Sequence, residues 1–245
     1  MKLALESTTD LLSKVQGFGD FDWISLSRAT EDKEYLDFYK ESDQLRVLNL
    51  GDGVSDPDIN QARELWESFG NPVVVSPDFT GDRMKTLKTY EICCQEFRPE
   101  NVIGVLQGSS YKEVLSCIPH YQGQIAVPYN IGSMLATPNS FMALRRALVV
   151  SNIPADRYVH LLGFTTLDEL EWYENKPNVL SINTGYPIML GMKSEDILDI
   201  DRECTKATIT LEAMKEVEAM NNKSLSQIQW TSIIRNIALL RRYIS

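Results

Sequence analysis

The chain has 245 residues, of which 43% are hydrophobic, and this is enough apolar material for one large core. Its formal net charge of −10 argues against a protein held on nucleic acid by bulk charge, because phosphate binding depends mainly on Lys and Arg. No stretch approaches the roughly 20 consecutive apolar residues that a membrane-spanning helix needs, so we expect no membrane association.

Four cysteines are spread along the chain without the CxxC spacing of a zinc or redox site: Cys93, Cys94, Cys117 and Cys204. The amino-terminal residues turn polar after Leu5 and lack the apolar run of a signal peptide. We therefore expect reduced thiols, no metal, no cofactor and a cytoplasmic location.

Short apolar or β-branched runs alternate with segments of helical periodicity along the chain. The strand-like runs cover residues 2–7, 22–27, 45–51, 71–78, 101–108, 123–130, 158–164 and 178–183. The clearest helical segments cover residues 31–42, 59–70, 82–97, 140–150 and 166–174. This alternation is typical of βα units joined in a parallel sheet.

Eight such units favour a closed (β/α)8 barrel of the TIM type over the alternative, a doubly wound open sheet. No linker rich in Pro, Gly or Ser interrupts the chain, so we predict a single domain over residues 1–245. Residues 194–245 are expected to form its final helix and a helical extension. Ser55 or Asp56 is expected to begin the helix after the third strand, and Gly70 to end it.

In such a barrel the chemistry lies at the carboxyl ends of the strands and in the loops that follow. Polar side chains are frequent at the predicted ends: Glu6, Ser27, Asn49, Asp52, Asp78, Gln107, Asn130 and Asn183. Carboxylates accept hydrogen bonds from ring N–H and amino groups, whereas amides both donate and accept. Because the standard phosphate-binding loop motifs are missing, this ring fits a nucleobase or nucleotide ligand better than a phosphate.

Three segments in order carry a resemblance to a known family. They are VVVSPDFTGD (73–82), VIGVLQGSSY (102–111) and RYVHLLGFTTLDEL (157–170). Their order and spacing resemble the tRNA-guanine transglycosylase (queuine tRNA-ribosyltransferase) superfamily, and the short phage and bacterial relatives that modify DNA in particular. The match covers about residues 45–187.

The resemblance implies base exchange at an N-glycosidic bond. In that family an aspartate attacks the sugar C1′, guanine leaves and a 7-deazaguanine takes its place, while a second carboxylate handles protons. The target base has to leave its stack to reach the mouth of the barrel. Members form dimers, some of which pair an active with an inactive subunit, so a homodimer or a heterodimer is implied as an open alternative.

The resemblance assigns base recognition to Asp78 and Gln107, the latter followed by Gly108. The structural alternatives are a helix N-cap or turn for Asp78 and a surface turn for Gln107. Tyr129 follows Pro128 where the family has a glycine-rich strand end, and it could stack on a base or narrow the pocket. Since Pro128 lacks a backbone donor, the ligand is expected to differ from a standard 7-deazaguanine.

The family's catalytic positions hold different residues in this chain. Asn183 falls where the resemblance places the nucleophilic aspartate, and Asn49 falls where the family has another aspartate. An amide is a poor nucleophile and cannot carry a proton at neutral pH. Asp52 replaces that second carboxylate if the alignment shifts by a few residues. The family's zinc-binding cysteine and histidine cluster is also missing.

Two functions stay open. The first is a transglycosylase-like transferase, or an N-glycosidic hydrolase that uses Asp52 or Asp78 through water, acting on a base in DNA, RNA or a nucleotide, for example in phage DNA modification. The second is an inactive barrel of the same superfamily that binds a base or supports a partner, which the paired Asn49 and Asn183 favour. A third reading, an enzyme for a phosphorylated metabolite, rests only on GFTT at residues 163–166.

Three further expectations concern residues outside these motifs. His160 lies within a predicted strand and is expected in the core or behind the site. Arg145 and Arg146 are expected on a solvated helix face, with a nucleic-acid contact as the alternative. The tryptophans share no spacing and are expected to pack in the helix layer: Trp23, Trp66, Trp172 and Trp230.

Overall fold

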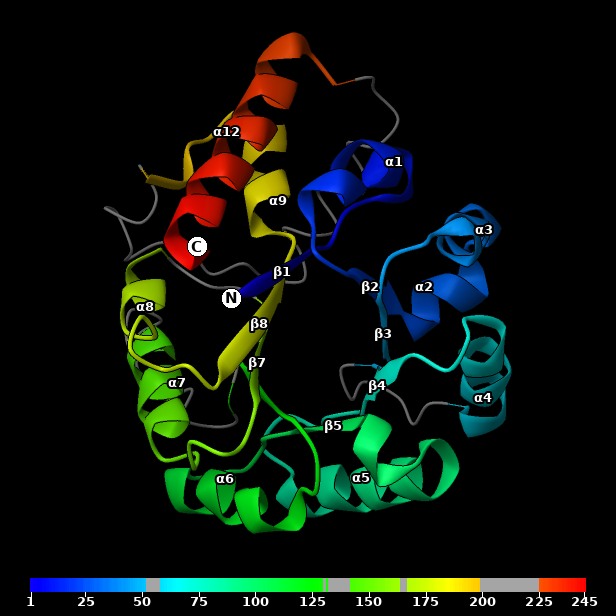
Figure 1. Ribbon diagram of the computed structural model, residues 1–245, viewed down its shortest axis with the longest axis vertical. Helices are drawn as coiled ribbons and strands as arrows, with labels where there is room; N and C mark the ends of the chain where they lie inside the picture. The colour runs from blue at the N-terminus through cyan, green and yellow to red at the C-terminus, as the bar shows by residue number, and fades with distance from the viewer. Residues whose placement is uncertain (52–57, 130, 132–141, 164–166, 199–224) are drawn as a thin grey trace.

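The computed structural model describes residues 1–51, 58–129, 131, 142–163, 167–198 and 225–245. Eight parallel strands, in the order β1-β8-β7-β6-β5-β4-β3-β2, curl into a nearly closed barrel with helices around its outside (Figure 1). The predicted (β/α)8 barrel is therefore confirmed, and the open doubly wound sheet is not observed.

The strands are short. Their bounds are Lys2–Leu5 (β1), Asp22–Ser25 (β2), Arg46–Asn49 (β3), Val73–Val75 (β4), Val102–Val105 (β5), Ile125–Pro128 (β6), Val159–Leu162 (β7) and Val179–Thr184 (β8). Most are nearly apolar along their whole length, as expected of strands covered on both faces. Ser27, which was expected at a strand end, lies instead in the helix that follows β2.

The helices that follow the strands differ in length, and several are preceded or followed by a 3-10 turn. The α-helices are α1 (Leu12–Val15), α2 (Leu26–Glu31), α3 (Lys33–Glu41), α4 (Ile59–Ser68), α5 (Arg83–Phe97), α6 (Tyr111–Cys117), α7 (Met142–Ser151), α8 (Leu167–Glu171), α9 (Tyr186–Met192) and α12 (Gln227–Ile244). The 3-10 turns are η1 (Thr9–Leu11), η2 (Gln16–Phe18), η3 (Pro99–Asn101) and η4 (Ile118–His120).

Helix α4 begins at a different residue from the one predicted. Asp58 is its N-cap, and the Asp58 carboxylate accepts hydrogen bonds from two first-turn N–H groups at 3.0 and 3.2 Å. The predicted caps Ser55 and Asp56 lie outside the described residues, and α4 starts after both. Gly70 follows the helix with φ +77°, so the predicted glycine stop is confirmed.

The helix that directly follows β8 is α9, which ends before residue 194 and so precedes the segment predicted to form the final helix. Helix α12 does form part of that segment, and it lies beside α9 (Figure 1). A Cβ on Gly191 would lie only 2.4 Å from the backbone nitrogen of Ile233, which shows how closely the two helices approach. Residues 199–224 are outside the described residues.

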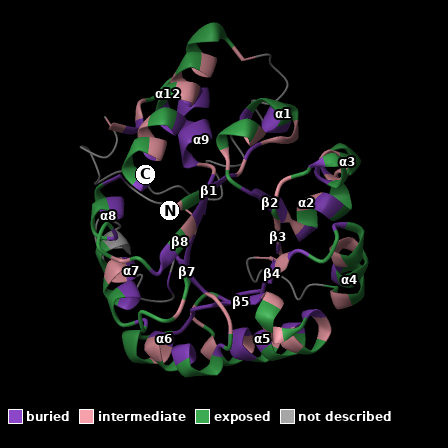
Figure 2. Ribbon diagram, in the orientation of Figure 1, coloured by how far each residue is buried: buried purple, intermediate pink, exposed green. Residues whose placement is uncertain are grey.

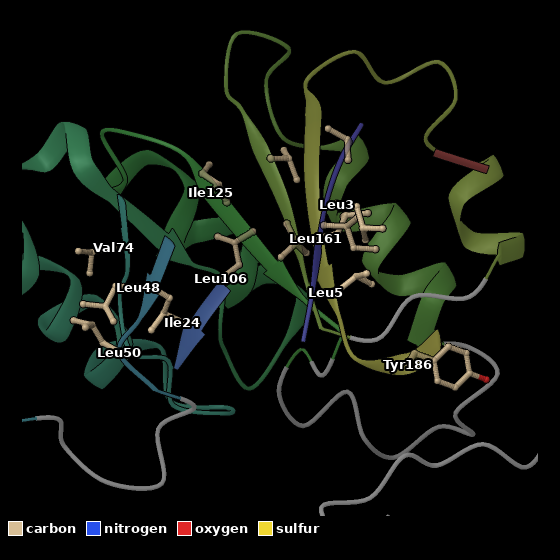
Figure 3. Close-up of a cluster of buried hydrophobic side chains, with 14 of the residues drawn as sticks. Leu3, Leu5, Ile24, Leu48, Leu50, Val74, Leu106, Ile125, Leu161 and Tyr186 are labelled. Atoms are coloured by element: carbon tan, nitrogen blue, oxygen red, sulfur yellow. The ribbon is translucent and has the colours of Figure 1, made fainter. Parts of the chain in front are cut away.

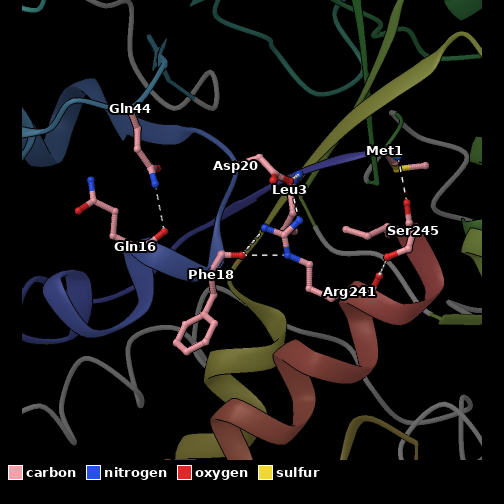
Figure 4. Close-up of polar contacts among 9 residues, drawn as sticks. Met1, Leu3, Gln16, Phe18, Asp20, Gln44, Arg241 and Ser245 are labelled. Atoms are coloured by element: carbon pink, nitrogen blue, oxygen red, sulfur yellow. Dashed lines mark hydrogen bonds and ion pairs between the residues drawn. The ribbon is translucent and has the colours of Figure 1, made fainter.

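The first and last strands of the sheet, β1 and β2, meet without a ladder of hydrogen bonds. Asp20 joins them: its N–H donates to Leu3 O at 2.6 Å, and its Oδ2 accepts from Leu3 N–H at 2.7 Å. Arg241 of α12 pairs with the same Oδ2 at 2.7 Å and also donates to Phe18 O (Figure 4). The carboxyl-terminal helix thus fastens the seam of the barrel.

Among the described residues, the buried apolar side chains form two separate groups. The larger group joins the outer faces of the strands to the helices, and it includes Leu3, Leu48 and Val74 (Figure 3). The smaller group contains strand residues and Phe21 but no helix residues, which places it in the lumen of the barrel. Figure 2 shows buried residues along the strands of the barrel and exposed residues on the outer faces of the helices.

The tryptophans do not share one layer as expected. Trp23 is 3% exposed and belongs to the lumen group, so its predicted place among the helices is wrong. Trp66 does pack in the helix layer, where its ring meets Phe97 edge to face at 5.5 Å. Trp172 is 46% exposed, and Trp230 is half-buried against the core.

Candidate functional site

A polar mouth lies above the apolar lumen, at the carboxyl ends of the strands. Successive residues of a strand point to opposite faces, so the residue two positions after a lumen residue also points inward. This alternation places Glu6 above Ala4, Asn49 above Val47 and Gln107 above Val105. On β8, Asn183 follows Ile182, which faces the helices, and so Asn183 faces the mouth as well.

Asp78 and Gln107, from the ends of neighbouring strands β4 and β5, are in direct contact. Gln107 Nε2 donates to Asp78 Oδ2 at 2.6 Å, and both side chains are almost fully buried, at 1% and 7% exposure respectively. Gln107 Oε1 also accepts from Gly81 N–H at 3.4 Å. We call these two residues the carboxylate–amide pair. Burial makes a charged acceptor beside an amide costly unless the hydrogen bonds are satisfied.

Asp78 is not a helix N-cap and Gln107 is not in a surface turn. Asp82, not Asp78, is the N-cap of α5, where its carboxylate accepts from Lys85 N–H at 2.9 Å. Gln107 is buried and is therefore no surface turn. Gly108 is needed for packing, because a Cβ there would lie 2.8 Å from Glu113 Cβ on α6. The loops that carry Asp78 and Gln107 are thus fixed by the Asp82 cap of α5 and by the packing of Gly108 against α6.

Tyr129 lies at the end of β6, half-buried, and its N–H donates to Leu162 O at 3.0 Å. Its ring is 5.2 Å from the guanidinium of Arg146, which is itself fully buried. Arg146 makes two 2.6 Å bonds to Glu169, and Tyr173 OH donates to Glu169 Oε1 at 2.7 Å. The expected solvated position of Arg146 is therefore wrong. Its guanidinium lies over the Tyr129 ring.

On the side of the mouth formed by β8 and β1, Asn183 joins two neighbouring strands. Asn183 Nδ2 donates to Glu6 Oε1. Asn183 Oδ1 accepts from His160 Nε2 at 2.7 Å and from Gly163 N–H at 3.2 Å, where Gly163 adopts φ +86°. Since β1 and β5 are farthest apart in the strand order around the barrel, this group faces the carboxylate–amide pair across the mouth.

The hydrogen-bond partners of His160 determine its tautomer. Asn183 Oδ1 can only accept, so His160 Nε2 carries the proton and Nδ1 accepts from Ser181 Oγ at 2.8 Å. Burial lowers the pKa of His160 to about 4, and the ring is therefore neutral at pH 7. It stacks on Trp23 with a centroid distance of 5.0 Å. His160 lies in the core, as expected, and it fixes the orientation of the Asn183 amide.

Glu6 is the carboxylate nearest to Asn183. Its side chain is half-buried, and burial raises its pKa above the ordinary value, although the hydrogen bond from Asn183 and the charge of Arg28 lower it in part. Arg28 is held beside it by a 2.6 Å bond to Ser7 O and lies over the Tyr35 ring. A carboxyl group that titrates closer to neutral pH is suited to proton transfer or nucleophilic attack.

The other predicted site residues are placed only in part. Asn49 ends β3, half-buried, and its Oδ1 lies 3.5 Å from Gly51 N. Asp52 lies outside the described residues, as do Asn130 and residues 164–166 of the GFTT segment.

Glu6 and His160 received no catalytic role in the sequence analysis, yet both contact Asn183. Glu6 was visible as a polar strand end. Its contact with Asn183 depends on the pairing of β1 with β8, which joins residues 177 positions apart.

Comparison of the sequence with models of known protein families and with curated proteins finds no match. Within the described part of the chain, no group of three or more His, Cys, Asp or Glu side chains is placed to hold a metal ion. None of the described helices is long and apolar enough to cross a membrane.

Proposed function

We propose that the mouth of this barrel binds a nucleobase and that the protein acts at the N-glycosidic bond of that base, as a transglycosylase-like enzyme of base exchange or base release. The proposal rests on the 2.6 Å contact between Gln107 and Asp78. An ionised carboxylate only accepts hydrogen bonds, whereas the amide both donates and accepts. Together they match a purine edge such as that of guanine, which presents N–H donors next to a carbonyl acceptor.

The opposite wall supports chemistry in addition to binding. A base held by the carboxylate–amide pair at β4 and β5 directs its sugar toward β8 and β1, where Glu6 supplies a carboxylate. Tyr129, directly after β6, stays a predicted stacking partner of the base, a role that follows from its place in the sequence. The resemblance to the tRNA-guanine transglycosylase superfamily supports the same chemistry.

We also propose a cytoplasmic setting and a substrate that is nucleic acid or nucleotide. The free thiols of the described cysteines, Cys93, Cys94 and Cys117, support the first point. The net charge of −10 favours a target base that is recognised by the mouth rather than by a broad basic surface. Modification of phage DNA and assembly as a homodimer or heterodimer are parts of the proposal that follow from the resemblance alone.

A base-release and base-exchange assay tests the proposal. The protein is incubated with guanine-labelled tRNA, single- and double-stranded DNA and free nucleosides, and labelled base is separated by chromatography. Asp78→Asn keeps the size of the side chain but removes its charge, and we expect it to reduce turnover by about 10- to 100-fold, the usual effect of one charged hydrogen bond. Asp37→Asn, on the exposed face of α3, is the matched control. Equal turnover in both variants would refute the role of the pair.

A second candidate is a base-binding barrel without catalysis. It is favoured by the Asn183 amide, whose oxygen accepts two hydrogen bonds and whose nitrogen donates to Glu6, an arrangement suited to a structural role. This candidate predicts that wild-type protein binds guanine but releases no base from any substrate in the assay.

A further inference from the structure

The chain has a carboxylate beside the position where the nucleophile is expected. Glu6 extends β1 by one residue, since its N–H donates to Thr184 O at 3.0 Å in continuation of the pairing with β8. Its side chain points into the mouth, because Ala4 belongs to the lumen group and Leu5 to the outer core. Glu6 therefore lies opposite the carboxylate–amide pair, on the other side of the barrel.

The two oxygens of Glu6 have different surroundings. Oε1 accepts from Asn183 Nδ2, whereas no hydrogen bond to Oε2 is found among the described residues. The Asn183 amide cannot flip and exchange its oxygen and nitrogen, because His160 Nε2–H and Gly163 N–H both donate to the oxygen. One oxygen is thus held by Asn183, while the other has no such bond within the described part of the chain, an arrangement that suits a positioned nucleophile.

The same contacts explain why residue 183 is an amide. An aspartate there would place two carboxylates within hydrogen-bonding distance, and such a pair shares one proton at neutral pH. An asparagine donates to Glu6 instead and stabilises its charged form. Arg28, which lowers the pKa of Glu6 by its charge, acts in the same direction. Asn183 is therefore a positioning residue for Glu6.

Resting on the proposed function, we infer that Glu6 is the nucleophile that replaces the aspartate missing from position 183. A lone pair of Oε2 forms a bond to the sugar C1′ while the C1′–N bond breaks. The electron pair of the C1′–N bond goes to the leaving base, which takes a proton from water. The glycosyl ester is then opened at C1′ by water for release, or by the ring nitrogen of an incoming base for exchange. The attacking group loses one proton to solvent, and Glu6 returns to its carboxylate form.

The test compares Glu6→Gln with wild type, with Glu34→Gln on the exposed face of α3 as the matched control. Base release is measured from labelled oligonucleotide or tRNA, binding is measured with free guanine, and a protein–nucleic acid adduct is sought on denaturing gels and by mass spectrometry. We expect Glu6→Gln to lose at least about 1000-fold in release and all adduct, with guanine affinity changed by less than about threefold. Unfolding midpoints confirm that the variants are folded.

Each of the other outcomes refutes a different part of the inference or of the proposed function. Turnover that survives Glu6→Gln but is lost in Asp78→Asn refutes the role of Glu6 and leaves the proposed function intact. Loss of turnover in Glu6→Gln without an adduct in wild type refutes the covalent step. Wild-type protein that binds guanine without any turnover refutes both the inference and the enzymatic part of the proposed function.

Discussion

Replacing Asn183 with Asp is expected to destabilise the protein in a pH-dependent way. The substitution removes the donor to Glu6 and places a second carboxylate against the first. At about 3 Å and an effective dielectric constant of about 20, two unit charges repel by about 5 kcal/mol. Solvent at the mouth screens part of this, and we expect about 2 to 3 kcal/mol, or a rise of about two units in the upper pKa of the pair.

The sign of the pH dependence follows from linkage. The pair in the folded protein binds a proton more tightly than the same two carboxyl groups in the unfolded chain. The tighter proton binding contributes to the free energy of unfolding in full below about pH 4, the ordinary carboxyl range. This contribution is lost as the pH rises through the raised pKa of the folded pair. Compared with wild type, Asn183→Asp should be nearly as stable at pH 4 and about 2 to 3 kcal/mol less stable at pH 8.

Urea unfolding at a series of pH values measures this difference directly. The double variant Glu6→Gln with Asn183→Asp is the control, because it leaves one carboxylate and should recover most of the stability at pH 8. Parallel stability profiles for wild type and Asn183→Asp from pH 4 to 8 would show that the two side chains do not interact as described.

Three further substitutions probe other parts of the structure. Glu169→Ala is expected to cost about 3 to 5 kcal/mol in denaturant unfolding, because it removes the carboxylate that neutralises the buried Arg146 guanidinium. Asp20→Ala is expected to cost about 1 kcal/mol at pH 7, because the seam acceptor and the Arg241 ion pair are lost. Burial raises the pKa of Asp20, but hydrogen bonds from Arg241 and the backbone outweigh it and lower the pKa overall, so that difference should shrink as the pH falls below about 4. Gly108→Ala is expected to weaken guanine binding in a dialysis assay, because its Cβ would lie 2.8 and 2.9 Å from atoms of α6.

Each of these expectations has a clear contrary result. A Glu169→Ala variant within about 1 kcal/mol of wild type would mean that water reaches the guanidinium. A cost for Asp20→Ala that grows toward acid pH would contradict the lowered pKa. Unchanged guanine binding in Gly108→Ala would show that the position of α6 does not affect the base-binding site.

Much of the fold could be predicted from periodicity because the strands are covered on both faces and are therefore nearly continuous apolar runs. Helix α9 was missed for a related reason. All of its residues are buried between the barrel and α12, so it has no polar face to produce a helical pattern. The burial of Arg146 was also missed, because its partner Glu169 is 23 positions away and their contact depends on tertiary packing.

The site also has one contact that could be predicted from the sequence and one that could not. Asp78 and Gln107 could be placed near each other because they end successive strands of a parallel sheet, and such ends meet at one edge. The contact of Glu6 with Asn183 could not be predicted, since it requires the first strand to close on the eighth. Sequence spacing carries no information on such a closure.

Equilibrium dialysis with labelled guanine is the most direct test of the claim that the mouth recognises a nucleobase. We predict saturable binding at one site, weakened at least about tenfold by Asp78→Asn and unchanged by Asp37→Asn. Absence of saturable binding, or binding that Asp78→Asn leaves intact, would contradict the assignment of the carboxylate–amide pair to base recognition.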